Sequence, residues 1–323
     1  MNRIPLSNVS FEGDNNVYLF DDGVPTLIDT GDWMPETREN LATSLAEYGL
    51  EFGDIERIFL THWHGDHIGL ANDIQEAGGA TVYVHELDAP LVGGDSDAWE
   101  TLESLREQRF EHWGIPEEDR ETLRAIFGSG PSLAETPEVT PITDGDSFSV
   151  GDDTLTAVHA PGHAAGLCMY EFGDEVFSGD ALLPKYTPNV GGADIRVENP
   201  LEKYLQTLEA IEQAEYERAW PGHRDVISDP TGRARDIITH HEERSYRVLD
   251  ALSRLGPTDA WTVSADLFGE LESIHILHGP GESYAHLEHL REAGAVNRDG
   301  RNYSLADGIA ETLTELETER WPL

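Results

Sequence analysis

The sequence predicts an α/β protein with a layered body and a smaller, mostly helical C-terminal domain. Short apolar runs alternate with amphipathic stretches over roughly residues 15–225, which is typical of strands alternating with helices. Glycine- and proline-containing turns rich in histidine and aspartate follow several of the predicted strands. The composition shifts near residue 230, where residues 231–255 form one long helical pattern. We therefore expect domains at residues 1–230 and 231–323.

The length and composition are those of a globular protein. The chain has 323 residues, of which 38% are hydrophobic and 26% charged, enough for a large core and a second domain. Its apolar runs are too short to span a membrane, and the N-terminus resembles no secretory signal. Cys168 is the single cysteine, which suits a reducing compartment. These features predict a cytoplasmic protein.

The charge is strongly one-sided. The chain has 63 acidic and 21 basic residues, a net charge of −42, and Lys185 and Lys203 are its only lysines. A disordered acidic tail does not fit, because the acids are spread among periodic apolar residues. In molar salt the Debye length is only about 3 Å, so like charges barely repel. We therefore predict a protein from a halophilic host.

The body begins with strands and helices in alternation. We expect strands at 16–20, 26–29, 55–60 and 81–84, with helices at 35–50 and 68–77. Further strands are expected at 146–150, 154–158, 167–172, 175–177 and 218–220, with a helix at 201–214. Residues 128–141 are predicted to be a loop.

Residues 86–135 interrupt this alternation. Two helices are expected there, at 97–113 and 116–127. An inserted helical pair near a loop-borne site often forms a lid or a pocket wall. Trp113 is a candidate pocket residue, as are Trp99, Phe110 and Phe127, although such aromatic residues more often pack an insertion onto the body.

The segment after residue 230 predicts a small winged-helix-like domain. Beyond the long helix at 231–255, helices are expected at 267–271 and 283–293 and a strand at 303–305. Residues 283–293 would occupy the recognition-helix position. That segment is acidic, whereas phosphate binding favours a basic face, so nucleic acid is a disfavoured partner. His240 and His241 either pack against the body or approach its site.

Histidine and aspartate recur at four predicted strand ends. Imidazole and carboxylate are ligands of zinc and similar metals. Glycine beside each candidate lets the backbone turn sharply, so that the side chains can face a shared centre. The candidate ligands are His62, His64, Asp66, His67, His163, Asp180 and His223.

These seven residues divide into two sets. His62, His64 and His163 would hold one ion, and Asp66, His67 and His223 the other, with Asp180 bridging them. Two divalent ions about 3.5–4 Å apart can share a water and convert it to hydroxide near neutral pH. Zn²⁺ is the expected metal, with Mn²⁺ or iron as alternatives.

The order of these motifs resembles that of the metallo-β-lactamase superfamily, over roughly residues 15–225. His62-Trp63-His64-Gly65-Asp66-His67 matches its HxHxDH signature, and Leu27-Ile28-Asp29-Thr30-Gly31 its early strand-end motif. Its later ligand motifs are matched by Pro161-Gly162-His163, Ser178-Gly179-Asp180 and Pro221-Gly222-His223. The resemblance implies an αββα fold of two sheets between helices, with the site at one edge.

Neighbouring residues are expected to support the site. Asp29, at the end of a buried strand, is a candidate for fixing a ligand imidazole, and His159 is a weaker one. Asp66 is expected to orient the nucleophile or to take its proton. Tyr186 lies in the segment after Asp180 and is a candidate pocket residue.

The resemblance is nearest to glyoxalase II-like hydrolases, which implies that hydroxide held between the metals attacks a thioester or related ester. A lactone is the alternative within the same chemistry. A metal-dependent endoribonuclease is the competing class, and a winged-helix metal sensor is a non-enzymatic one. We expect a small-molecule substrate and no membrane partner, and a homodimer stays open.

Overall fold

The computed structural model describes residues 1–7, 13–127, 136–310 and 313. Within these ranges the chain forms two compact units. The first unit contains Met1–Glu100, Pro131–Pro188 and Thr207–Ala234, and the second contains Thr101–Gly130, Asn189–Gln206 and Arg235–Leu323. Segments 101–130 and 189–206 thus group with the C-terminal part of the chain. The sequence-based division at residue 230 stays a prediction.

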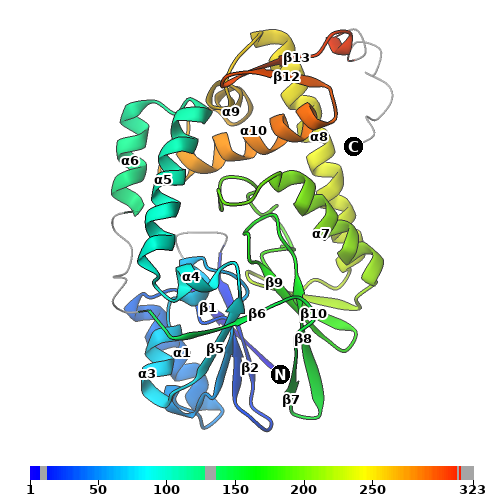
Figure 1. Ribbon diagram of the computed structural model, residues 1–323. Helices are drawn as coiled ribbons and strands as arrows, with labels where there is room; N and C mark the ends of the chain where they lie inside the picture. The colour runs from blue at the N-terminus through cyan, green and yellow to red at the C-terminus, as the bar shows by residue number, and fades with distance from the viewer. Residues whose placement is uncertain (8–12, 128–135, 311–312, 314–323) are drawn as a thin grey trace. The chain divides into compact units, whose positions relative to one another are not determined.

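The first unit contains a six-stranded sheet whose spatial order follows the chain. Its first three strands pair antiparallel, and the later ones pair parallel (Figure 1). The strands are β1 (Asn2–Leu6), β2 (Asn15–Phe20), β3 (Thr26–Ile28), β4 (Arg57–Phe59), β5 (Thr81–His85) and β6 (Val139–Ile142).

Strand β6 corrects the loop predicted for residues 128–141. Val139 to Ile142 pair in parallel with Val82 to His85 of β5. Pro137 and Pro141 give this segment the composition of a loop. An edge strand tolerates proline because its outer N–H groups need no partner strand, and β6 lies at the edge of the sheet. Residues 128–135 of the predicted loop lie outside the described residues.

A second, five-stranded sheet completes the first unit, in the order β11-β10-β9-β8-β7. Strands β10 and β11 are parallel, and the other pairs are antiparallel. The strands are β7 (Ser147–Val150), β8 (Asp153–His159), β9 (Cys168–Phe172), β10 (Glu175–Gly179) and β11 (Arg218–Pro221).

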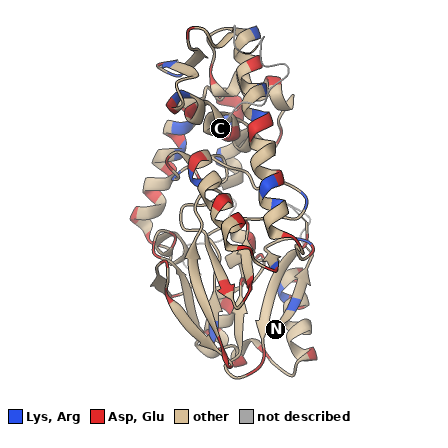
Figure 2. Cartoon of the chain, turned by 90° about the vertical axis from the view of Figure 1, so that its right-hand side faces the viewer, with Lys and Arg blue, Asp and Glu red and all other residues tan. Residues whose placement is uncertain are grey.

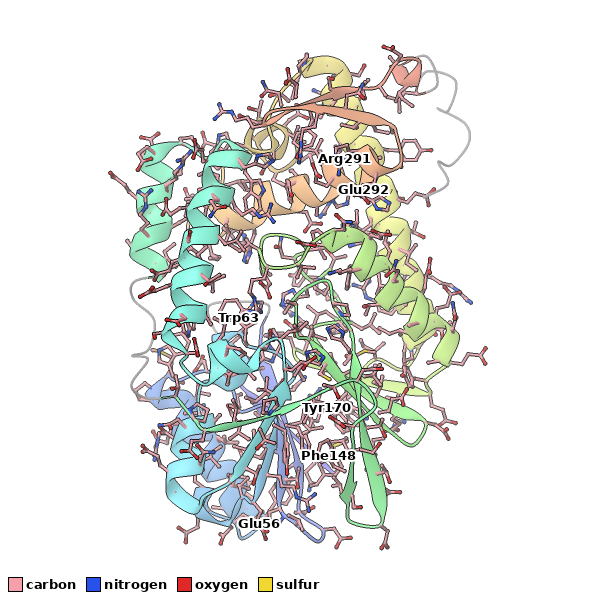
Figure 3. The ribbon with its side chains drawn as sticks, viewed as in Figure 1. Glu56, Trp63, Phe148, Tyr170, Arg291 and Glu292 are labelled. Atoms are coloured by element: carbon pink, nitrogen blue, oxygen red, sulfur yellow. The ribbon has the colours of Figure 1, made fainter. Side chains whose placement is uncertain are left out.

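Aromatic and aliphatic side chains of the two sheets pack on each other. Phe59 of the first sheet contacts Phe148 and Tyr170 of the second, with ring centroids 4.8 and 5.5 Å apart. Figure 3 labels the two residues of the second sheet. On its other face the first sheet packs against α1 (Pro35–Glu47) and α3 (Ala71–Gly78). The predicted mixed α/β fold is therefore observed. Shorter elements are the 3₁₀ turn Phe52–Asp54, α2 (Gly65–Ile68) and α4 (Ala89–Val92).

The second unit is mostly helical. Helices α5 and α7 each have residues in both units, and α8 enters the second unit after Ala234. The helices are α5 (Ser96–Trp113), α6 (Glu117–Phe127), α7 (Pro200–Ala214), α8 (Pro230–Leu255), α9 (Ala260–Phe268) and α10 (His275–Glu292); the hairpin is β12 (Val296–Asp299) and β13 (Asn302–Leu305).

Helix α10 begins eight residues earlier than the predicted 283–293, and α9 also begins earlier than predicted. Gly279-Pro280-Gly281 suggests a helix end, because proline has no N–H to donate. The structure instead continues the helix through Pro280. Glycine is needed there, since a Cβ on Gly281 would lie 2.3 Å from Cα of Gly192. The order of two helices and then a strand is the predicted one, whereas β12, which pairs with that strand as a hairpin, was not predicted. A winged-helix assignment stays a prediction.

Acidic residues occur along the elements of both units (Figure 2). This even distribution agrees with the spread of the 63 acidic residues in the sequence. Among the residues that the structure describes, no helix combines the length and the apolar character needed to cross a membrane.

Candidate metal centre

The seven predicted ligands come together in the first unit, at the ends of strands from both sheets. His62 follows β4, and the loop after it leads into α2, whose first turn contains Asp66 and His67. His163 follows β8, and Asp180 and His223 follow the parallel strands β10 and β11. Strands that end at one edge bring distant parts of the chain to one place. All of these side chains are buried except that of His64, which is half-buried.

Three histidines form the first group. Nδ1 of His64 lies 2.9 Å from Nε2 of His62 and 3.1 Å from Nε2 of His163. Because a zinc–nitrogen bond is about 2.0 Å long, two ligands of one ion lie no more than about 4 Å apart. The three nitrogens therefore have the spacing that one ion requires.

The second group consists of Asp66, His67 and His223. Oδ2 of Asp66 lies 3.9 Å from Nε2 of His67 and 3.5 Å from Nε2 of His223. This group has a carboxylate where the first has an imidazole, so its oxygen would favour a harder ion.

Asp180 lies between the two groups. Its Oδ1 is 3.6 Å from Nε2 of His67, and its Oδ2 is 3.7 Å from His163 and 3.4 Å from His223. One carboxylate thus faces histidines of both groups. This is the position that the sequence predicts for a bridging ligand.

The residues fit a pair of cations. Nε2 of His67 and Oδ1 of Asp180 are buried, and neither has a hydrogen-bond partner among the described residues. Burial disfavours a charged His67, yet the carboxylates of Asp180, Asp66 and Asp29 raise its pKa well above the usual value. Burial disfavours a charged Asp180, but His223 and His67 hold its pKa well below the usual range. The centre therefore favours positive charge between its carboxylates.

Groups behind the ligands hold three imidazoles in one tautomer. Nδ1 of His67 donates to Oδ2 of Asp29 at 2.8 Å, and Nδ1 of His223 to the Gly13 carbonyl at 3.2 Å. The Thr61 hydroxyl donates to Asp29 at 2.8 Å, so it accepts from Nδ1 of His62 at 3.0 Å. Each Nε2 is therefore left to face the centre.

Asp29 lies where the sequence predicts a supporting acid, and its backbone is unusual. Its φ of 58° is in the left-handed region, which non-glycine residues rarely adopt. Its Oδ1 accepts from the Thr61 N–H at 2.8 Å. Both carboxylate oxygens thus bind groups next to the metal loop, and such contacts can keep a strained backbone in place.

Two further supporting residues were not predicted. Asn15 Nδ2 donates to the carbonyl of Asp66 at 2.9 Å and to its Oδ2 at 3.3 Å. Asp88 is fully buried and accepts from the N–H groups of Trp63 and Gly166, both at 3.1 Å. It therefore joins the His62–His67 loop to the loop after His163. Neither residue belongs to a motif, so only their position after or within a strand could have suggested them.

Gly222 shows how closely the ligand turns approach one another. A Cβ at this residue would lie 2.4 Å from Oδ1 of Asp180 and 2.7 Å from Cε1 of His67. Any side chain here would displace a ligand. The glycine is required by this approach.

The structure places the remaining predicted residues as follows. His159 stacks on His85, with centroids 4.2 Å apart, and bonds the Ala165 carbonyl at 2.8 Å, so it is not brought to a ligand. Trp113 belongs to the second unit, where it is 1% exposed and packs on Tyr284. Tyr186 is 45% exposed. Pocket roles for Trp113 and Tyr186 stay predictions.

The sequence matches a known family over most of its length. A profile described as "Metallo-beta-lactamase superfamily" matches residues 11–223. The chain belongs to this superfamily. The buried histidine and aspartate set lies within the residues that this family model matches.

Solved and curated relatives agree with this assignment. A metallo-beta-lactamase family protein of Thermus thermophilus superposes with a TM-score of 0.79 at 31% identity, covering 94% of this chain and 98% of that one. A Bacillus subtilis protein named as a probable metallo-hydrolase is 24% identical, and the match includes 88% of this chain and 90% of that protein. An "Atrochrysone carboxyl ACP thioesterase" of Emericella nidulans is 26% identical, covering 74% of this chain and 61% of that protein.

The fungal relatives are longer proteins. The match to a lactamase-like protein of Pestalotiopsis fici, at 26% identity, includes 74% of this chain and only 60% of the relative. The chain thus spans about 60% of the length of such relatives.

Proposed function

We propose that the chain hydrolyses a thioester or a related activated ester with two divalent cations. The observation that carries this is Asp180, whose carboxylate faces His163 of one group and His67 and His223 of the other at 3.4–3.7 Å. A carboxylate in this position can bind two ions about 3.5–4 Å apart. We propose His62, His64 and His163 as ligands of one ion, and Asp66, His67 and His223 as ligands of the other.

The chain's own residues set up the reaction. When bound, two such cations supply an activated water and a polarised carbonyl. Oδ2 of Asp66 is oriented by Asn15 at 3.3 Å and faces the centre. We assign to Asp66 the role of orienting the attacking water or accepting its proton. Asp29, Thr61 and the Gly13 carbonyl hold the imidazoles and take no part in the chemistry.

Exposed aromatic side chains beside the ligand segments suit an organic acyl substrate. The guanidinium of Arg224, which follows His223, lies 4.9 Å from the ring centre of Tyr186, and Lys185 Nζ lies 5.2 Å from it. Trp33 is 42% exposed and covers Gly65 of the metal loop, where a Cβ would lie 2.4 Å from its ring. We propose that Tyr186 contacts the substrate.

The proposed substrate class is supported by two similarities. The sequence resembles glyoxalase II-like hydrolases, and a relative at 26% identity has a name that describes an acyl-carrier-protein thioesterase. A lactone is the alternative, because ring opening needs the same attack on a carbonyl.

A substrate panel tests the proposal. Purified protein in molar KCl, with added Zn²⁺ or Mn²⁺, is offered acyl thioesters, lactones and single-stranded RNA. We expect turnover of thioesters that is absent in Asp180→Ala. RNA cleavage without ester turnover would contradict the proposal and favour the endoribonuclease alternative. Comparing turnover with Zn²⁺, Mn²⁺ and Fe²⁺ identifies the metal, which we propose to be zinc.

We also propose that the protein functions in the cytoplasm of a halophile. The support is the net charge of −42 and the presence of only two lysines. At low salt the carboxylates repel one another over about 10 Å or more, whereas molar salt screens them within about 3 Å. Tm should therefore be higher in 2 M KCl than in 0.1 M KCl. An equal Tm in both would contradict this adaptation.

A further inference from the structure

The second unit contains an open cavity of about 420 Å³ that none of the chemistry above uses. Its walls come from α5, α10 and β12. This volume is within the range of small-molecule sites and exceeds what a single inorganic anion fills. The lining residues are Leu105, Gln108, Arg109, His112, Tyr284 and Arg298.

The charge of this lining is opposite to that of the chain. Acidic residues outnumber basic ones by 63 to 21 in the sequence, yet the described residues that line the cavity include two arginines and no carboxylate. Its other polar groups are an amide, a phenol and an imidazole, all of which can donate hydrogen bonds. A wall of donors with cationic groups suits a negatively charged ligand.

Arg109 supplies a charge that no close carboxylate balances. Its Nη1 donates to the Tyr284 hydroxyl at 3.0 Å, and its guanidinium lies 5.2 Å from the ring centre of Tyr284. Among the described residues, no carboxylate lies within 4.0 Å of it, and its Nε has no acceptor. The Tyr284 ring therefore orients the guanidinium without neutralising it.

The positive charge of Arg298 is only partly balanced by a carboxylate. Its Nη1 lies 2.9 Å from Oε1 of Glu288. The same carboxyl group accepts from Arg291 at 3.0 Å and from the Tyr303 hydroxyl at 2.6 Å. One carboxylate thus serves two guanidiniums, although Arg291 also pairs with Glu292 at 3.2 Å (Figure 3). Arg298 therefore shares its one carboxylate partner with a second guanidinium.

The pKa of His112 is affected by the same two guanidiniums. Burial lowers its pKa, and the nearby guanidiniums of Arg298 and Arg109 lower it further, against the attraction of Glu288. At neutral pH the ring is therefore an uncharged group. It can donate or accept one hydrogen bond to a ligand.

We propose that this cavity binds a small organic oxyanion, with a phosphate or carboxylate group held by Arg109 and Arg298. Guanidiniums match both groups through paired N–H donors. The apolar part of the ligand would lie against Leu105 and the Tyr284 ring. The proposal uses no residue of the metal-ligand set, so it does not depend on the proposed hydrolysis.

Three probes with one ring test the proposal by calorimetry. Phenyl phosphate, benzoate and uncharged benzyl alcohol are titrated into the full-length protein at the lowest KCl concentration that keeps it folded. We expect saturable binding of at least one of the two anions, and the tighter one identifies the preferred group. Binding of neither, or equal binding of benzyl alcohol, would overturn the proposal.

Variants separate this cavity from the metal centre, which can also attract anions. Arg109→Gln should weaken binding about tenfold or more, since a charge-assisted hydrogen bond contributes about 1.5–3 kcal/mol. Asp180→Ala should leave the affinity unchanged. The matched control is Arg254→Gln, which removes an exposed guanidinium paired with Asp250 and Asp266. Unchanged affinity in Arg109→Gln, or loss of binding in Asp180→Ala, overturns the proposal.

A second variant covers the case in which Arg109→Gln fails to fold. Leu105→Glu adds a carboxylate to the cavity wall and keeps both guanidiniums. We expect it to abolish anion binding, because the new carboxylate pairs with Arg109 in place of the ligand. Unchanged binding in this variant, with a normal circular dichroism spectrum, also overturns the proposal.

Discussion

Each compact unit contains a buried cluster of histidine and carboxylate side chains. The two clusters have similar residue types, but the charges and hydrogen-bond partners around them differ. The seven residues that we propose as metal ligands, here called the metal-ligand set, lie in the first unit: His62, His64, Asp66, His67, His163, Asp180 and His223. The second unit contains what we call the His241 cluster, which consists of His241, Arg244, Glu282 and His286. His241, Glu282 and His286 lie close enough to hold an ion by geometry alone.

The carboxylates differ most between the two clusters. In the metal-ligand set, Oδ1 of Asp180 has no hydrogen-bond partner among the described residues. In the His241 cluster, Oε1 of Glu282 accepts from Arg244 at 2.6 Å. Its Oε2 accepts from Asn189 Nδ2 and the Val190 N–H, both at 3.1 Å. An arginine thus already occupies the position where a metal would supply charge.

The imidazoles differ in the same way. His286 donates through Nδ1 to the Glu282 carbonyl at 2.8 Å, and its Nε2 lies 3.3 Å from Nδ1 of His241. Burial lowers the pKa of His286 to about 3 and that of His241 well below its usual value. Two neutral rings therefore share a hydrogen bond. Charge balance, more than residue type, distinguishes a site for cations from a structural network.

The largest effect should come from Asp180→Ala. This change removes the carboxylate that faces both ligand groups, so we expect ester hydrolysis to fall by more than about a hundredfold, beyond the range seen for supporting residues. Metal content, measured by mass spectrometry on dialysed protein, should fall below two ions per chain. Glu282→Gln is the comparison from the other cluster. If it lowered metal content as much, the contrast between the clusters would be wrong.

Arg244→Met should strongly destabilise the protein without changing its metal content. It leaves Glu282 buried with no counter-charge, and breaking a buried ion pair costs about 3–5 kcal/mol. Denaturation in urea, followed by circular dichroism, measures the loss. The double variant Arg244→Met/Glu282→Met should recover most of it. If the double variant did not recover stability, the Arg244–Glu282 pair would contribute to stability by more than charge compensation.

Asp29→Asn should reduce metal affinity by about 10–100-fold. An amide has one acceptor oxygen, so it cannot serve the Thr61 N–H, the Thr61 hydroxyl and His67 together. Competition with a chelator measures the affinity. His159→Asn is the matched control, because His159 contacts His85 and Ala165, and it should change the affinity little. Equal losses in both variants would remove the special role of Asp29.

The smallest effect concerns pH and tests the neutral state of the His241 cluster. The pKa of His286 is about 3 when folded, against about 6.5 in an unfolded chain, so between these values the unfolded state binds more protons. Its contribution to stability is therefore present above about pH 6.5 and is lost as pH falls. Between pH 7 and pH 5 the free energy of unfolding should fall for both proteins. We expect the fall to be about 2 kcal/mol smaller in His286→Asn than in the native chain.

Urea titrations at the two pH values measure this difference. The control is His275→Asn on the exposed side of the same helix, which should keep the native pH dependence. An unchanged slope in His286→Asn would show that the buried ring is not held neutral.

The candidate ligands could be picked out of the sequence because their signals are local. Each lies in a short turn after an apolar run, and the turn residues, such as Gly222, explain why the side chain can face the centre. Asp29 was found for the same reason. Asp88 and Asn15 could not be found, because their roles depend on which loops meet in three dimensions.

Other elements were missed because a local rule was overridden. The composition of β6 predicts a loop, yet pairing with β5 stabilises a strand. Gly279-Pro280-Gly281 suggests a helix end, yet α10 continues through it, and Gly281 packs on Gly192. His241 was singled out in the sequence. Its partner Glu282 lies 38 residues beyond Arg244, and no spacing rule connects them.

The prolines at the borders of the six-stranded sheet affect how the protein behaves in a crowded solution. Pro5 lies in β1 and Pro141 in β6, the two outermost strands. An exposed strand edge invites pairing with the edge of another molecule, which begins aggregation. Proline interrupts the row of N–H donors that such pairing uses. Molar salt weakens the mutual repulsion of acidic surfaces, so prolines at both edges would keep neighbouring molecules apart where charge alone cannot.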